Sequence, residues 1–191
     1  KIEIYFQDKQ LIVRDYGRGI PLGKLLDCVS KINTGAKYDS SVFKKSVGLN
    51  GVGLKAVNAL SQLFLVESFR NNQMKTIQFS CGELVKNNNI KKTDKLDGTK
   101  ISFIPDSNIF ESFEYNIEHI KEKLWNYVYL NCGLEINFNK EKFHSKNGLK
   151  DFLIKKMDIE HIVYDIIHIY EPDLEICITH TSNYNEEYFS F

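Results

Sequence analysis

The sequence predicts an α+β fold in which helices cover one face of a mixed β-sheet. Three observations carry this prediction. Alternating apolar side chains mark β-hairpins at 1–16 and 64–81. Apolar residues in steps of three and four mark helices, most clearly at 112–132. Strands and helices are interleaved along the chain, and the hairpins exclude a purely parallel, doubly wound sheet.

The first half of the chain contains the glycine-rich segments. Residues 22–32 have helical spacing, with one apolar face formed by Leu22, Leu25, Leu26, Val29 and Ile32. Residues 33–46 are polar without a sustained period, which predicts a long loop of the kind that is functional or disordered. Residues 48–62 read as a glycine loop followed by a helix.

The second half predicts strands and helices that alternate before a tail of short strands. Residues 86–98 are polar and we expect them to be solvated, whereas 99–105 read as a strand. Gly133 follows the helix expected at 112–132, at the position where helices commonly end on glycine. A strand and a short helix are expected after it, at 134–139 and 148–157. The tail from His161 alternates in short strands, so we expect a second domain to begin near 155–165, with domains at 1–155 and 156–191.

Composition sets broad limits. The 191 residues carry 25 basic and 25 acidic side chains, and this balance gives no support for a nucleic-acid or membrane partner. Four widely spaced cysteines without a CxxC pattern indicate reduced thiols in a cytoplasmic protein. No apolar run approaches the roughly 18 residues of a spanning helix. The chain starts with Lys1 rather than Met, so we expect a fragment without its natural N-terminus.

The segment GLNGVG at 48–53 allows two interpretations. It is either a tight turn before a helix or a phosphate cradle at a helix N-terminus. Its GxxGxG spacing differs from the GxGxxG dinucleotide fingerprint, and no GK[ST] of a Walker A loop is present. Taken alone, this loop favours the plain turn.

The segment DYGRGIP at 15–21 changes that balance. Asp15 ends an apolar strand, and its carboxylate could accept a hydrogen bond from an exocyclic amine of a base. Gly17 and Gly19 would let the backbone approach a flat ligand, above an apolar floor of Ile20 and Pro21. The simpler alternative is a turn in which Asp15 caps its own backbone. That alternative leaves the second glycine-rich loop unexplained.

Together the two loops predict a nucleotide site in two halves. Asp15 would read the base, and the glycine loop would hold the phosphates. Lys37 and Lys44 could neutralise phosphate charge, although solvated surface lysines explain them as well. Thr99 could donate its hydroxyl near the base, and the simpler alternative is a β-branched residue that starts a strand.

Three motifs carry a resemblance to a known family. The motifs are DYGRGIP (15–21), NTGAKYDS (33–40) and SVGLNGVGLKAVNALS (46–61). In this order and spacing, they resemble the GHKL ATPase domain of the B subunits of bacterial type IIA topoisomerases. GTKISFIPDSNIF (98–110) with the helix after it resembles the segment that leads to the transducer domain of that family. The resemblance covers essentially the whole chain and is closer to topoisomerase IV than to gyrase.

The resemblance implies a GHKL-type (Bergerat) sandwich that uses ATP with Mg²⁺. Asp15 would read adenine with Thr99 and an ordered water, and Arg18 would pair with a family glutamate beside the pocket. Lys37 and Lys44 would belong to a closing lid. The nucleotide-binding residues expected in this way are Asp15, Gly17, Arg18, Gly19, Ile20, Pro21, Lys37, Lys44, Gly48, Leu49, Asn50, Gly51, Val52, Gly53, Leu54 and Thr99.

The resemblance also implies what lies elsewhere. The general-base glutamate and the asparagine that holds Mg²⁺ are expected upstream of Lys1, so this chain would supply no catalytic or metal-binding residue and would hydrolyse ATP poorly. The parent protein would be an ATP-dependent topoisomerase in which ATP binding closes a dimer of two such domains around DNA. Its partner would be the DNA-cleaving A subunit in an A2B2 heterotetramer.

The chain departs from the family pattern at several positions, and two alternatives stay open. Tyr16 stands where many relatives have Asn or Asp, and Val47 and Asn50 stand where many have Gly and His. One alternative is the catalytic domain of a sensor histidine kinase, which shares the Asp-Gly-x-Gly pattern. The other is a nucleotide-binding module that has lost hydrolysis and acts as a dimerisation switch.

Overall fold

The computed structural model describes residues 1–32, 34, 51–157, 161–183 and 186–191. This part of the chain divides into two compact units. The first comprises Lys1–Tyr115 with Asn137–Glu141, and the second comprises Asn116–Ile136 with Lys142–Phe191. The domain boundary expected near 155 lies inside the second unit and stays a prediction.

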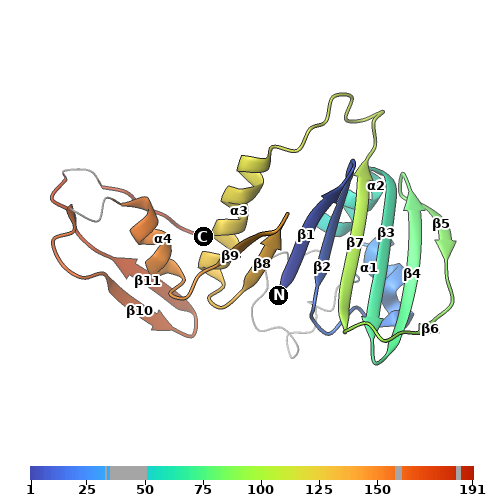
Figure 1. Cartoon of the computed structure of the whole chain (residues 1–191), viewed down its shortest axis with the longest axis horizontal. Helices are drawn as coiled ribbons and strands as arrows, with labels where there is room; N and C mark the ends of the chain where they lie inside the picture. Colours follow the sequence, from blue (N-terminus) through green and yellow to red (C-terminus); the bar gives the residue numbers. More distant parts are fainter. Residues whose placement is uncertain (33, 35–50, 158–160, 184–185) are drawn as a thin grey trace. The chain divides into compact units, whose positions relative to one another are not determined.

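A large β-sheet forms the first unit (Figure 1). The strand order is β5-β4-β3-β7-β2-β1-β8-β9, and β6 pairs with β4. The pairings among β1 to β7 are antiparallel. Their bounds are β1 Ile2–Gln7, β2 Gln10–Asp15, β3 Ser61–Arg70, β4 Gln73–Ser80, β5 Glu83–Asn87, β6 Lys91–Lys92 and β7 Gly98–Pro105. The hairpins predicted at 1–16 and 64–81 are therefore confirmed.

Helices cover one face of this sheet (Figure 1). A 3-10 turn at Leu22–Lys24 leads into α1 (Leu25–Ser30), and α2 spans Gly53–Ala59. The core between helices and sheet consists of six buried side chains: Leu25, Val29, Phe64, Val66, Ile77 and Phe79. Ile32, expected on the buried helix face, is exposed because α1 ends before it.

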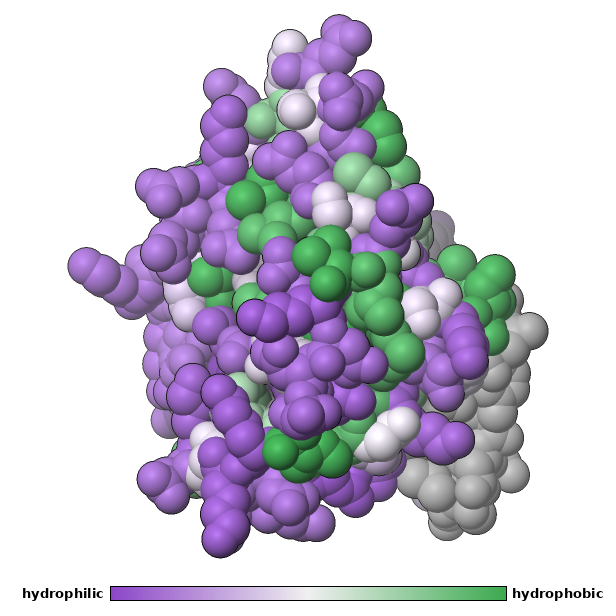
Figure 2. All heavy atoms as spheres, turned by 90° about the vertical axis from the view of Figure 1, so that its right-hand side faces the viewer, coloured by the Kyte–Doolittle hydropathy of each residue, from purple (hydrophilic) through white to green (hydrophobic). Residues whose placement is uncertain are grey.

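Residues 86–98 contain more β-structure than the sequence predicts. Their side chains are largely exposed, yet β5 and β6 pair their backbones with β4. Figure 2 looks onto this side of the molecule and shows apolar patches separated by hydrophilic side chains. Glu83 and Lys86 place charges on the edge strand β5, which discourages pairing with another chain.

The long helix is shorter than the sequence predicts. Helix α3 spans Ile117–Leu130 rather than 112–132. The side chain of Asn116 accepts a hydrogen bond from the backbone N–H of His119 at 3.0 Å and so caps the first turn. Phe113, assigned by spacing to the helix face, instead packs its ring against Phe110 and Tyr115.

The second unit contains helix α3 and the elements that follow it in the chain, except that residues 137–141 belong to the first unit. Helix α4 spans Leu149–Lys156, as expected, and β10 (Ile167–Glu171) pairs with β11 (Leu174–Ile178) in a hairpin. Strand β8 (Glu135–Phe138) was expected, but β9 (Glu141–His144) was not. Positive φ angles at Asn139 and Lys140 form the two-residue turn between them, a conformation that the sequence alone signals only through the asparagine.

Candidate nucleotide-binding site

Asp15 lies at the end of β2, and its carboxylate joins two parts of the backbone. Oδ1 accepts a hydrogen bond from the N–H of Gly17 at 2.8 Å, and Oδ2 accepts one from the N–H of Thr99 at 3.1 Å. An ionised carboxylate offers about four acceptor positions. The two backbone bonds therefore fix the orientation of Asp15 and leave acceptor capacity on both oxygens.

The register places Asp15 on the face of the sheet that the helices cover. Val13 pairs with Ile101, which packs against the helix-covered core, and side chains two residues apart share a face. The same rule places Ser68 and Thr99, which are paired across β3 and β7, on this face. Three polar residues thus converge where the apolar core ends.

Two side chains of β3 hold the loop that follows Asp15. Ser68 Oγ donates to the carbonyl oxygen of Ile20 at 2.7 Å, and Arg70 Nη1 donates to the carbonyl oxygen of Gly19 at 3.3 Å. Sequence reasoning missed both residues. The available signal was weak, since serine and arginine near a strand end are common on solvated positions.

Gly19 packs closely on β3, while its expected approach to a bound base stays a prediction. Its φ is +68°, and a Cβ there would overlap the carbonyl oxygen of Phe69. The missing side chain thus lets the loop backbone pack directly on β3. At Gly17, a Cβ would lie 3.0 Å from Asp15 Oδ1, so glycine keeps that carboxylate oxygen accessible.

The other expected residues of this loop divide between core and surface. Ile20 packs against the core cluster beneath the helices. Pro21 is exposed and precedes the 3-10 turn, while Arg18 is exposed at the tip of the loop. The apolar floor that Ile20 and Pro21 were expected to form under a base stays a prediction.

The described part of the second glycine loop leads directly into α2. Gly51 has a φ of +56°, and Gly53 is the first residue of the helix. A Cβ added at Gly53 would have no neighbour within 4 Å, while Leu54 packs against the core. The other predicted phosphate contacts lie outside the described residues: Lys37, Lys44, Gly48, Leu49 and Asn50.

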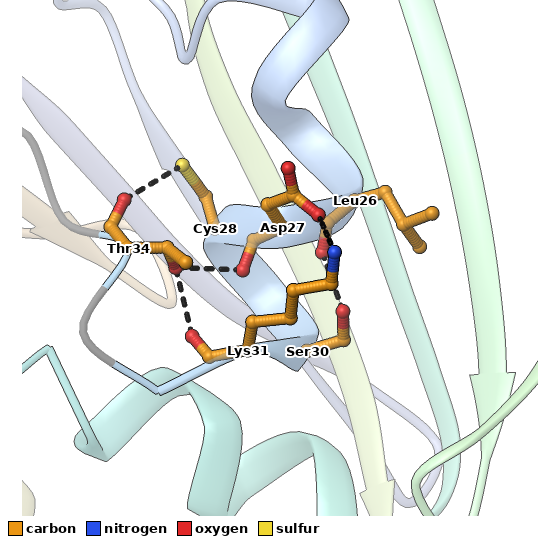
Figure 3. A network of polar contacts seen from close by, with 6 residues as sticks. All are labelled: Leu26, Asp27, Cys28, Ser30, Lys31 and Thr34. Carbon is orange, nitrogen blue, oxygen red and sulfur yellow. Dashed lines mark hydrogen bonds and ion pairs between the residues drawn. The ribbon is translucent and has the colours of Figure 1, made fainter.

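Thr34 belongs to the NTGAKYDS motif and has a defined role at the end of α1 (Figure 3). Its Oγ1 lies 2.7 Å from the carbonyl oxygens of both Asp27 and Lys31. Cys28 Sγ lies 3.7 Å from the carbonyl oxygen of Thr34, and Lys31 pairs with the Asp27 carboxylate. The Thr34 hydroxyl can therefore donate to either carbonyl oxygen at the end of the helix, where the Lys31 N–H also donates to the Asp27 carbonyl oxygen.

Other kinds of site find less support. The described residues contain no cluster of three or more His, Cys, Asp or Glu side chains arranged for a metal ion. No helix within them is long and apolar enough to cross a membrane. A shallow hollow of about 400 Å³ lies along β1 and the turn after β8, but neither Asp15 nor Thr99 lines it.

The chain is similar to known proteins over nearly its whole length, although no protein-family model matches it. It is 49% identical over 191 residues to the B subunit of DNA topoisomerase 4 from Borreliella burgdorferi, covering 100% of this chain and 32% of that protein. It is 30% identical over 197 residues to the B subunit of DNA gyrase from Campylobacter jejuni, covering 94% of this chain and 26% of that protein.

A solved structure shares the fold. The 43K ATPase domain of Thermus thermophilus gyrase B, crystallised with an aminocoumarin, matches with a TM-score of 0.75 at 26% identity. The match covers 97% of this chain and 52% of that one. The chain therefore has the fold of the gyrase B ATPase domain, which confirms the predicted α+β class.

The particular family follows from the relatives. The chain belongs to the B subunits of bacterial type IIA topoisomerases. It spans 32% and 26% of the lengths of the two relatives above. This membership favours the resemblance seen in the motifs over the sensor-kinase alternative.

Proposed function

We propose that this chain binds ATP and that Asp15 reads the adenine base. The observation that carries the proposal is the Asp15 carboxylate, which the N–H groups of Gly17 and Thr99 hold in one orientation. Adenine presents an exocyclic amine that donates hydrogen bonds, whereas guanine presents a carbonyl oxygen at that position. A carboxylate acceptor at this point therefore favours adenine.

We assign the phosphates to residues 48–54, with Lys37 and Lys44 as charge partners. The described support is limited to Gly51 and Gly53, whose backbone leads into α2 without a side chain in the way. Family membership supports the same assignment. Positive φ at Gly51 also favours successive backbone N–H groups that point in one direction, as anion-binding loops require.

The proposed reaction is hydrolysis of a phosphoanhydride bond of Mg²⁺-bound ATP. In this scheme the residues of this chain bind and orient the nucleotide, because Asp15 is already committed to the base. The carboxylate that activates water and the ligand of Mg²⁺ would come from outside residues 1–191. Positioning and electrostatic stabilisation supply most of the rate enhancement in reactions of this kind.

At the length of its relatives, the protein would be an ATP-dependent DNA topoisomerase. Two copies would close on ATP binding around a DNA duplex and reopen after product release, and an A subunit would cleave DNA. Ligand binding shifts such an equilibrium only through a difference in affinity between open and closed states. The 49% identity to a topoisomerase 4 protein favours topoisomerase IV over gyrase.

Strand passage tests this function. The protein at the length of its relatives, combined with its A subunit, should relax supercoiled DNA only when ATP is present. Asp15→Asn should abolish that activity, because an amide would turn an NH₂ group toward one of two backbone N–H donors. Asp8→Asn, in the exposed turn between β1 and β2, is the matched control and should keep it. ATP-independent relaxation would contradict the proposal.

A further inference from the structure

Arg14 is a buried cation directly behind Asp15. Adjacent residues of a strand point to opposite faces, so Arg14 lies on the sheet face away from the helices. It is only 8% exposed, and its guanidinium carbon lies 4.8 Å from the ring centre of Tyr16 and 4.5 Å from that of Phe69. A guanidinium between two aromatic faces is held in position by cation–π attraction.

The guanidinium binds the backbone of the segment that enters β7. Nη2 donates to the carbonyl oxygen of Leu96 at 2.5 Å and lies 3.3 Å from that of Asp97. Asp97 Oδ1 in turn accepts a hydrogen bond from the N–H of Asn71 at 3.0 Å. Nη1 is buried and has no hydrogen-bond partner among the described residues. The hydrogen bonds of the buried cation therefore go to this one segment.

The segment bound by Arg14 ends at the amide that holds Asp15. Gly98 and Thr99 follow Asp97 immediately, and the N–H of Thr99 donates to Asp15 Oδ2. A Cβ at Gly98 would overlap the carbonyl oxygen of Asp15 and would lie 2.6 Å from Arg14 Nη1. The two backbones are thus in direct contact, with Arg14 as the side-chain tie between them.

We propose that Arg14 is a positioning residue for base selection: it holds residues 96–98 so that the Thr99 N–H fixes the Asp15 carboxylate. This inference rests on the proposed role of Asp15 in reading adenine. Without the hydrogen bonds of Arg14 to this segment, the Asp15 carboxylate would lose the Thr99 N–H as a donor and could rotate. Discrimination between an amine and a carbonyl on the base would then weaken, because it depends on a fixed acceptor.

Tyr16 links the arginine site to Glu3, because its ring contacts Arg14 and its hydroxyl binds Glu3. Its hydroxyl donates to Glu3 Oε2 at 2.7 Å, and Glu3 Oε1 pairs with Lys1 at 2.8 Å. Hydrogen bonds from Lys1 and Tyr16 lower the pKa of Glu3, so this carboxylate stays ionised near Arg14. Tyr16, a departure from the family pattern, thus has a structural role as one wall of the arginine site.

The test compares Arg14→Met, Arg14→Lys and the control Ile12→Ala in the protein at the length of its relatives. Ile12 is buried on the same face of the same strand but does not bind the 96–98 segment. The first readout is hydrogen–deuterium exchange of the Thr99 amide without nucleotide. The second is the ratio of affinities for ATP and GTP.

We expect Arg14→Met to speed exchange at Thr99 by at least about tenfold and to lower the ATP-to-GTP affinity ratio by about tenfold. Arg14→Lys should recover part of both effects, because lysine keeps the cation–π contact but not the planar fork. Ile12→Ala should lower stability without changing the ratio. Unchanged Thr99 exchange in Arg14→Met would overturn the inference. Failure of the wild type to bind ATP would instead overturn the proposed function, because the exchange result does not depend on nucleotide.

Discussion

At the scale of single residues, the site depends on backbone contacts that the sequence does not display. The position of Asp15 at a strand end and the two nearby glycines could be predicted from their order. The close packing of Gly19 on the carbonyl oxygen of Phe69 could not be predicted, because Phe69 is 50 residues away and becomes a neighbour only through the strand order. Arg14 was hidden for the same reason, because its partners come from the entry to β7.

Gly19→Ala should therefore be strongly destabilising. The new Cβ would combine an unfavourable positive φ with overlap on the Phe69 carbonyl oxygen, so we expect a loss of about 3 kcal/mol in the free energy of unfolding. Gly23→Ala is the matched control, because a Cβ there has no neighbour within 4 Å. That control should change the free energy by less than about 1 kcal/mol. Denaturant unfolding measures both variants. An equally small effect of the two substitutions would contradict the packing role of Gly19.

At the scale of elements, apolar spacing located helices and strands but not all of their ends. Spacing alone assigned Phe113 to a helix, whereas aromatic neighbours hold it outside and Asn116 supplies the cap. Strand β9 was missed because its four residues carry too little alternation to stand out. Residues 86–98 were read as solvated, which describes their side chains but not their paired backbone.

Helix α4 offers a test at this scale, because Asp151 organises its first turn. Its carboxylate accepts hydrogen bonds from Ser145 Oγ at 2.7 Å and from both the backbone and the side chain of Asn147. Burial alone would raise the pKa of Asp151, but these hydrogen bonds outweigh it and lower the pKa below the ordinary value. The folded state therefore favours the ionised form.

Asp151→Asn should lower the free energy of unfolding at neutral pH by about 1–2 kcal/mol, as expected for weakening the hydrogen bonds that Ser145 and Asn147 donate to a charged acceptor. Because the folded pKa is lowered, the wild-type advantage is present above the ordinary carboxyl pKa of about 4 and disappears as the pH falls through the folded value. Glu118→Gln, an exposed carboxylate in the first turn of α3, should change stability by less than about 0.5 kcal/mol. An equal effect of both substitutions at every pH would contradict the role of Asp151.

At the scale of the whole molecule, the motifs indicated the family and the fold, and the relatives confirmed both. The division into compact units does not test the domain boundary expected near 155, which stays a prediction. The tail changes pattern near 155, but the two compact units separate at Tyr115 and Asn116, with 137–141 returning to the first. Such a division depends on long-range contacts, which local periodicity does not report.

Residues 1–191 by themselves should turn over ATP much more slowly than the protein at the length of its relatives. Under the proposed function the general base is not among these residues, and loss of general-base catalysis typically costs about 100-fold to 10,000-fold in rate. A phosphate-release assay on both proteins measures the difference. Equal turnover would show that a carboxylate within this chain activates water.

The central claim is that Asp15 reads adenine, and one nucleotide titration tests it most directly. The protein at the length of its relatives, wild type and Asp15→Asn, is titrated with ATP and GTP in parallel by calorimetry. We expect the wild type to bind ATP at least about 100-fold more tightly than GTP and Asp15→Asn to lose at least about tenfold in ATP affinity. Equal affinity for the two nucleotides, or ATP binding unchanged by Asp15→Asn, would contradict it.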